Sequence, residues 1–151
     1  MTPPAPSPGV FDGKVHLLPI RVYYEDTDFS GIVYHANYLR YFERGRSDFL
    51  RLAGISHTEL RALDQPVAFA VVHMDISFKK AARIDDALVV RTYYEAMTGA
   101  RFIARQRIDR GDDLVAEAIV QAVCIDAQGR ARRPPPPVAQ RLQTWFLPAP
   151  P

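Results

Sequence analysis

A chain of 151 residues with 48% hydrophobic residues is the size of one domain and can build a core. Its 19 basic and 17 acidic residues leave a net charge of +2, which predicts no strong field toward nucleic acid or an anionic membrane. No apolar run reaches the roughly 18 residues of a membrane span, and the first residues do not resemble a signal peptide, so we expect a soluble cytoplasmic protein.

The first 13 residues hold four prolines and two glycines and predict a disordered leader. Residues 14–147 are expected to form a single domain, followed by a tail at 148–151. The domain begins with a segment rich in aliphatic and aromatic residues, 14–24, which predicts a strand. An acidic turn follows it, and apolar residues at helical spacing then predict one long helix over 36–53. Gly54 is a suitable stop for this helix.

The second half of the chain changes to strand patterns. A capping-box pattern at 56–59 predicts a short helix to about residue 63. Four strands are then predicted, with turn signals between them, at 67–78, 87–96, 101–109 and 114–126, and their short links predict antiparallel pairing of adjacent strands. A short helix is expected at 138–146, where Trp145 and Phe146 would serve as packing anchors. The order predicts an α+β fold with about five antiparallel strands wrapped around a central helix.

The acidic turn before the long helix is the candidate functional site. The first turn of a helix has N–H groups without intrahelical partners, and its dipole favours negative charge. A carbonyl that becomes an oxyanion would be stabilised there, beside a carboxylate a few residues upstream such as Asp28. Asp26, Asp28 and Ser30 are equally typical of turns and helix caps. Spacing alone leaves both interpretations open.

The segment 23–38 carries a long signature, D-x-D-x-x-G-x-V-x-H-x-x-Y, which begins at Asp26 and ends at Tyr38. It closely resembles the 4-hydroxybenzoyl-CoA thioesterase family of hotdog-fold proteins, and within that family the acyl-CoA thioesterases of the YbgC type, which are associated with Tol-Pal. The resemblance extends over about residues 16–142.

This resemblance implies hydrolysis of an acyl thioester without a metal or an organic cofactor. The catalytic carboxylate of the family corresponds to Asp28, acting as a nucleophile or as a general base. The backbone N–H that polarises the carbonyl corresponds to His35, with Tyr34 and Val33 in the same turn. The resemblance also implies that the side chains of Tyr24 and His35 line the site, and that Gly31 allows the turn.

Coenzyme A carries phosphates, so we expect basic groups at the mouth of such a site. The candidates are Lys79, Lys80, Arg83 and Arg101, although charges at strand ends also serve to solvate edges. The long helix must bury much of its surface and still present its first turn to a ligand. We therefore expect a homodimer that pairs into a tetramer, with sites at subunit interfaces.

Other reactive residue types are assigned structural roles. Cys124 lies in an apolar stretch and is expected to be a buried hydrophobe. No two histidines have a spacing typical of metal ligands, so a metal site is not expected. Asp26 is interpreted as a turn partner. Phe29 and Ser30 stand where relatives often carry small residues, which leaves the acyl-chain preference open.

Three rival functions differ in the donor or in the chemistry. The donor could be acyl carrier protein instead of free CoA. The chain could bind acyl-CoA without turnover, as a scaffold protein linked to Tol-Pal. A hydratase on the same fold is the third alternative, because a fold alone does not assign chemistry.

Overall fold

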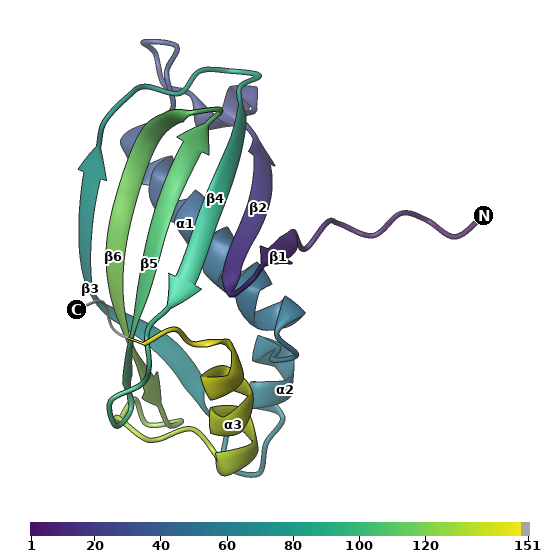
Figure 1. Cartoon of the computed structure of the whole chain (residues 1–151), viewed down its shortest axis with the longest axis vertical. Helices are drawn as coiled ribbons and strands as arrows, with labels where there is room; N and C mark the ends of the chain where they lie inside the picture. Colours follow the sequence, from purple (N-terminus) through teal and green to yellow (C-terminus); the bar gives the residue numbers. More distant parts are fainter. Residues whose placement is uncertain (149–151) are drawn as a thin grey trace.

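The computed structural model describes residues 1–148, in which one antiparallel sheet curves around a long helix (Figure 1). Within these residues, six strands pair in the order β1-β2-β4-β5-β6-β3. The strands are β1 Val10–Asp12, β2 Val15–Arg21, β3 Ala68–Phe78, β4 Ala87–Tyr94, β5 Arg101–Arg110 and β6 Asp113–Ile125. The helices are α1 His35–Leu52, α2 His57–Arg61 and α3 Pro136–Trp145, with a 3-10 turn, η1, at Tyr24–Asp26. The predicted α+β arrangement is confirmed, with one strand more than expected.

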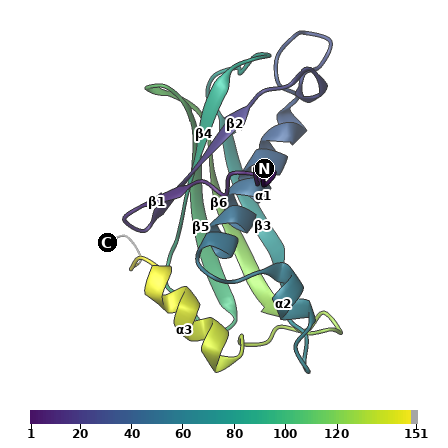
Figure 2. The same cartoon turned by 90° about the vertical axis from the view of Figure 1, so that its right-hand side faces the viewer.

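Helix α1 lies along one face of the sheet (Figure 2). Its buried positions recur at helical spacing: Tyr38, Tyr41, Phe42, Gly45, Phe49 and Leu50. The helix packs tightly against the sheet at Gly45, where an added Cβ would lie 2.8 Å from Thr92 Oγ1 and 2.8 Å from Val90 Cγ1 on β4. A larger residue at Gly45 would push the helix off the sheet. The predicted helix over 36–53 is confirmed to within one residue at each end.

The prediction of a disordered leader over 1–13 is wrong for residues 10–13. Residues 10–12 form β1, which pairs antiparallel with β2 across a turn where Gly13 has a φ of 61°. Phe11 explains why this segment is ordered. Its ring stacks on that of Trp145, with centroids 4.1 Å apart, and meets the ring of Phe49 edge-on, with centroids 5.0 Å apart. The sheet therefore begins at Val10, while the chain before it extends away from the body (Figure 1).

Strand neighbours in sequence are not always neighbours in the sheet, contrary to the predicted pairing. β4, β5 and β6 form successive hairpins, but β3 pairs with β6, and β4 pairs with β2. The link 79–86 crosses the end of the sheet, because Val22 N donates to Asp86 O at 3.0 Å and Asp85 N donates to Val22 O at 2.9 Å. This brings the β3–β4 link beside the acidic turn.

The C-terminal segments pack as predicted. Phe146 is buried at the end of α3 and stacks against Tyr94 with ring centroids 5.4 Å apart.

Ser56 caps α2, as the capping-box pattern predicts, by accepting a hydrogen bond from the amide of Glu59 at 3.0 Å. Cys124 is buried, and burial raises the pKa of its thiol to about 11. Of the predicted tail, 148–151, all but Pro148 lies outside the described residues.

Candidate active site

The acidic turn folds as a tight hairpin between β2 and α1. Thr27 pairs with Val33 across it, and the amide of Asp28 donates to Ile32 O at 2.9 Å. The amide of Gly31 donates to Asp28 O at 3.0 Å, and Gly31 has a φ of 81°. A turn followed by a left-handed residue is a common three-residue hairpin loop, and glycine adopts that conformation without strain. Asp28 therefore stands at the base of a short, closed loop.

The carboxylate of Asp28 is exposed and is bonded within its own loop. Its Oδ1 accepts a hydrogen bond from the Ser30 amide at 2.8 Å and another from the Ser30 hydroxyl. These bonds, and to a smaller extent the charge of His35, hold the pKa of Asp28 below its ordinary value. Asp28 is therefore ionised at neutral pH and lies within electrostatic range of the first residue of α1.

The start of α1 leaves one predicted donor unoccupied. The amide of Val33 donates to Ala82 O at 2.8 Å, and the amide of Tyr34 donates to Asp26 O at 2.9 Å. No side chain caps this helix, and within residues 1–148 the His35 amide has no hydrogen-bond acceptor. Of the three amides predicted at this turn, only that of His35 is available to a ligand oxygen.

Asp26 has the structural position expected of a turn partner. Its carboxylate accepts a bond from the Tyr23 amide at 2.8 Å, which closes η1. Its backbone carbonyl accepts bonds from the Tyr34 amide and, at 2.8 Å, from Asn37 Nδ2. Asp26 thus joins η1 to the first turn of α1 and holds the two ends of the hairpin together.

Tyr38, the last residue of the signature, links α1 to the β3–β4 link. Its buried hydroxyl accepts a bond from the amide of Ala82 at 3.1 Å, and the carbonyl of Ala82 in turn accepts the Val33 amide. Ala82 is fully buried. The β3–β4 link therefore supports the hairpin from behind and sets the position of the helix start.

Aromatic side chains surround the hairpin and face outward. Tyr24 is 83% exposed, and the Phe29 side chain is fully exposed. The ring of His35 lies 4.6 Å from that of Tyr34 and 6.2 Å from that of Phe78, between centroids. A hollow of about 610 Å³ on the outer face of the sheet contains none of these residues. In a single chain, the carboxylate therefore lies on an open aromatic surface.

A family model described as the thioesterase-like superfamily matches residues 22–146. The chain belongs to this superfamily. A Haemophilus influenzae relative named acyl-CoA thioesterase YbgC is 41% identical over 108 residues, covering 72% of this chain and 79% of the relative. An Escherichia coli relative named acyl-CoA thioester hydrolase YbgC is 42% identical over 109 residues, covering 72% and 80%.

Solved structures agree with this assignment. A probable thioesterase from Bartonella henselae is 43% identical with a TM-score of 0.78, and the match covers 80% of this chain and 99% of that one. These relatives confirm the predicted resemblance to hotdog-fold thioesterases of the YbgC type. The thioesterase has no helix in residues 1–148 that is long and apolar enough to cross a membrane.

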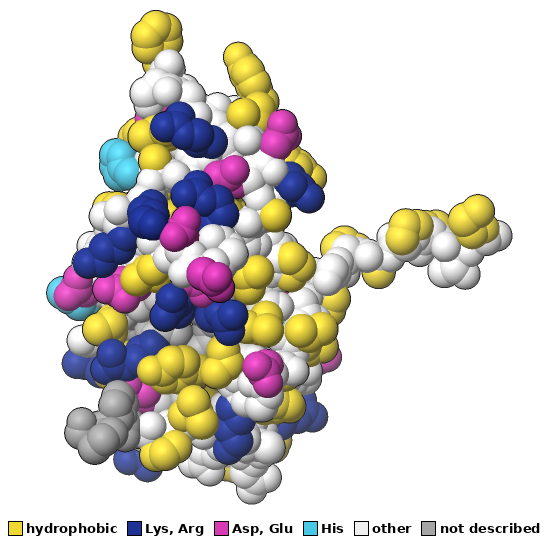
Figure 3. All heavy atoms as spheres, turned by 45° about the horizontal axis from the view of Figure 1, so that its top comes forward, with side chains coloured by type: hydrophobic (Ala, Val, Ile, Leu, Met, Phe, Trp, Pro, Cys, Tyr) yellow, Lys and Arg dark blue, Asp and Glu magenta, His cyan; other side chains and the backbone are white. Residues whose placement is uncertain are grey.

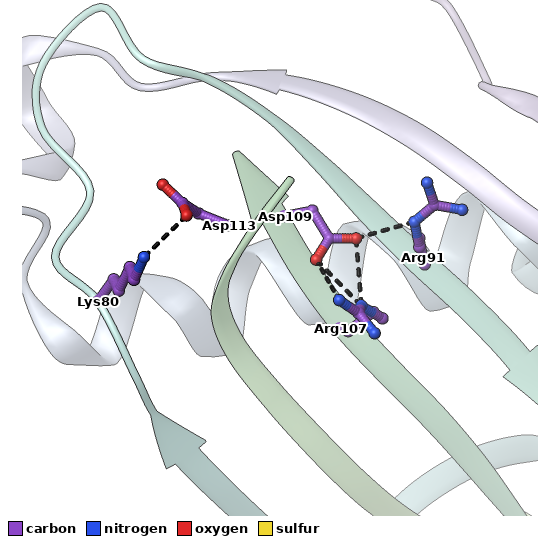
Figure 4. A network of polar contacts seen from close by, with 5 residues as sticks. All are labelled: Lys80, Arg91, Arg107, Asp109 and Asp113. Atoms are coloured by element: carbon purple, nitrogen blue, oxygen red, sulfur yellow. Dashed lines mark hydrogen bonds and ion pairs between the residues drawn. The ribbon is translucent and has the colours of Figure 1, made fainter. Parts of the chain in front are cut away.

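The predicted CoA-binding residues of the thioesterase fall into two places. Lys79, Lys80 and Arg83 lie on the β3–β4 link, and Arg83 pairs directly with Ile32 of the hairpin. Lys80 Nζ is engaged by Asp113 at 2.7 Å (Figure 4). Arg101 begins β5 at the opposite end of the sheet, about 30 Å away along a ten-residue strand. Within one chain, the fold does not bring Arg101 to the hairpin.

Charged residues that sequence reasoning missed lie on the outer face of the sheet. Arg91 and Arg107 both bind the buried carboxylate of Asp109, each at 2.8 Å (Figure 4). Basic and acidic side chains are interspersed on the face of the molecule drawn in Figure 3. The sequence pattern that could have predicted these outward-facing charges is the alternation of Arg105, Gln106 and Arg107. The first and third of three consecutive strand residues lie on the same face of the sheet.

Replacing Tyr38 with phenylalanine is expected to destabilise the thioesterase by about 1–3 kcal/mol. The change removes the acceptor of a buried amide and leaves that amide unsatisfied. Urea unfolding would measure the loss as a lower midpoint with an unchanged slope.

Tyr41 provides the matched control for this prediction. Its hydroxyl is buried one turn away on α1 and has no hydrogen-bond partner within the described residues. Burial and the nearby Asp26 carboxylate raise the pKa of Tyr41. Tyr41→Phe should therefore be neutral or stabilising, and equal losses in both variants would show that the Ala82 bond has no special weight.

Proposed function

We propose that this thioesterase hydrolyses acyl-CoA thioesters to the free acid and CoA, with Asp28 acting at the carbonyl carbon and the His35 amide polarising the carbonyl oxygen. One observation carries the proposal: an ionised carboxylate and an unoccupied helix N-terminal amide lie on the two sides of one short hairpin. The YbgC relatives, which are named as an acyl-CoA thioesterase and an acyl-CoA thioester hydrolase, support the substrate class.

The His35 amide acts on the charge that develops in the transition state. As the carbonyl carbon becomes tetrahedral, its oxygen becomes an oxyanion, which the amide and the dipole of the 18-residue α1 stabilise. One such donor is typically worth about 2.7–4 kcal/mol. Because α1 has no side-chain cap, the donor need not give up another partner when the substrate binds.

Two routes use the same atoms of Asp28. In the first, a carboxylate oxygen bonds to the acyl carbon and the C–S bond breaks, giving a mixed anhydride that water then hydrolyses. In the second, the carboxylate takes a proton from the water that attacks the carbon. Single turnover in ¹⁸O water tests the first route, because label found in the Asp28 carboxylate identifies an anhydride that water opens at the aspartyl carbon.

A second subunit is part of this proposal. The aromatic surface around the hairpin is open in one chain, and β3 is an edge strand with Val71 and Val72 exposed. Exposed apolar surface next to an unpaired strand edge is typical of an interface. A dimer, pairing further into a tetramer, would enclose the substrate. Light scattering would contradict this if the active species were a monomer.

The basic residues on the β3–β4 link are proposed to meet the phosphates of CoA. Arg83 is the best placed, since it is exposed and pairs with the hairpin. The same residues would suit the acidic surface of acyl carrier protein, which is the alternative donor. A reaction without cofactor belongs to this proposal, because no step above requires a metal or an organic group. A cytoplasmic location is part of the proposal as well.

Thiol release over a panel of donors tests the proposed function. Short, long and aromatic acyl groups should be supplied on CoA, on acyl carrier protein and on pantetheine, which lacks the nucleotide phosphates. We expect turnover of the CoA thioesters, with a higher KM for the pantetheine thioesters. Saturable binding without thiol release would instead support a scaffold protein, and loss of enoyl-CoA absorbance without thiol release would support a hydratase.

A further inference from the structure

The two oxygens of the Asp28 carboxylate have different surroundings. Oδ1 accepts both donors of Ser30, the amide at 2.8 Å and the hydroxyl. Within residues 1–148, no donor reaches Oδ2. Two bonds from one residue to one oxygen fix the plane of a carboxylate, which would otherwise rotate freely at an exposed position.

We propose that Ser30 is a positioning residue: it holds Oδ1 of Asp28 so that Oδ2 is the oxygen presented to the acyl carbon. The inference rests on the proposed function and adds to it a residue at a position that the D-x-D-x-x-G signature leaves unspecified. Ser30 can act in this way because the left-handed Gly31 closes the loop and returns the Ser30 hydroxyl over the carboxylate.

A carboxylate held through Oδ1 and reacting through Oδ2 suits both routes of hydrolysis. In direct attack, the electron pair of Oδ2 forms the C–O bond, the C–S pair leaves with sulfur, and the thiolate takes a proton from water. In the general-base route, Oδ2 receives a proton from the attacking water as the water oxygen bonds to the acyl carbon, the C–S pair leaves with sulfur, and the thiolate takes a proton. In both routes the carboxylate must be ionised and aimed, and a positioned group gains much of its rate from correct geometry.

The role of Ser30 can be measured through the pKa of Asp28, which depends on the groups around that carboxylate. The charged and titratable residues on neighbouring elements include His35 on α1, all three residues of η1 (Tyr24, Glu25 and Asp26), and Arg83 on the β3–β4 link. Of the effects that lower the pKa of Asp28, the Ser30 hydroxyl is the largest and His35 is a smaller one. Removing the hydroxyl should therefore raise the pKa of Asp28, so that activity is lost at a higher pH on acidification.

Ser30→Ala is the test, measured as kcat and as the pH profile of kcat/KM with acyl-CoA. We expect kcat to fall by about 10- to 100-fold and the acid limb to move to higher pH. Ser30→Thr keeps the hydroxyl and should restore both quantities. Ser47→Ala is the matched control, because it removes another hydroxyl-to-carboxylate bond, to Glu43 Oε1 at 3.2 Å, and should move neither.

Asp28→Asn in the same series separates the two hypotheses. If Asp28→Asn is inactive while Ser30→Ala keeps the kcat and acid limb of the unaltered protein, Ser30 has no positioning role and the proposed function stands. If Asp28→Asn retains full activity, the proposed function itself fails. Circular dichroism at each pH restricts the comparison to folded protein.

Discussion

Replacing Asp28 with asparagine is expected to lower the rate of thiol release by about 10²–10⁴-fold while leaving the protein folded. Asparagine has nearly the same shape, and its side-chain oxygen can still accept the two Ser30 donors that close the loop. It carries no negative charge, so it is a poor nucleophile and a poor base. Steady-state kinetics with an acyl-CoA that the unaltered protein hydrolyses measures the effect, and gel filtration checks the assembly.

Asp26→Asn is the matched control for this experiment. It removes a carboxylate two positions away, whose oxygen accepts the Tyr23 amide, a bond that asparagine can also accept. We expect this variant to retain most of its activity. Equal losses in the two variants would indicate a general effect of charge on the hairpin and would remove Asp28 from its special position in the mechanism.

The contribution of the His35 amide can be isolated by comparing His35→Pro with His35→Ala. Both changes remove the imidazole, but only proline also removes the backbone N–H. We expect kcat for His35→Pro to be lower than for His35→Ala by about 10²–10³-fold, which is the usual effect of deleting one oxyanion donor.

Local structure makes proline acceptable at this position. His35 is the first residue of α1, where proline is favoured because its missing N–H has no intrahelical partner. The preceding residue, Tyr34, has φ −61° and ψ 131°, an extended conformation that a following proline permits. The two variants should therefore have similar thermal stability. If their kcat values also agree, the amide does not polarise the carbonyl.

Sequence patterns predicted the parts of the fold that depend on local periodicity. Helix α1 and strands β2–β6 follow from the spacing of apolar residues over ten or so positions. β1 was not predicted because prolines and glycines dominate the sequence around it. The aromatic residue that holds this strand in place is Phe11, whose ring stacks on Trp145, far away in the sequence. The position of β3 at the sheet edge was missed because strand pairing depends on where a link crosses, which local patterns do not encode.

The candidate site was also predicted only where its residues are close together in sequence. Asp28, Gly31 and His35 are contiguous in sequence, so one motif could indicate all three. The support from Ala82 is 44 residues away from Tyr38 and could not be read from that motif. Arg101 was grouped with the β3–β4 link because both lie at strand ends, but the direction of β5 places it at the far end of the sheet.

A crystal structure with a CoA ketone analogue, in which a methylene group replaces the thioester sulfur, tests the central claim most directly. The account predicts the ketone oxygen about 2.7–3.1 Å from the His35 amide nitrogen and Oδ2 of Asp28 about 3–3.5 Å from the carbonyl carbon, in the same bound molecule. An analogue bound with its carbonyl away from either atom would contradict it.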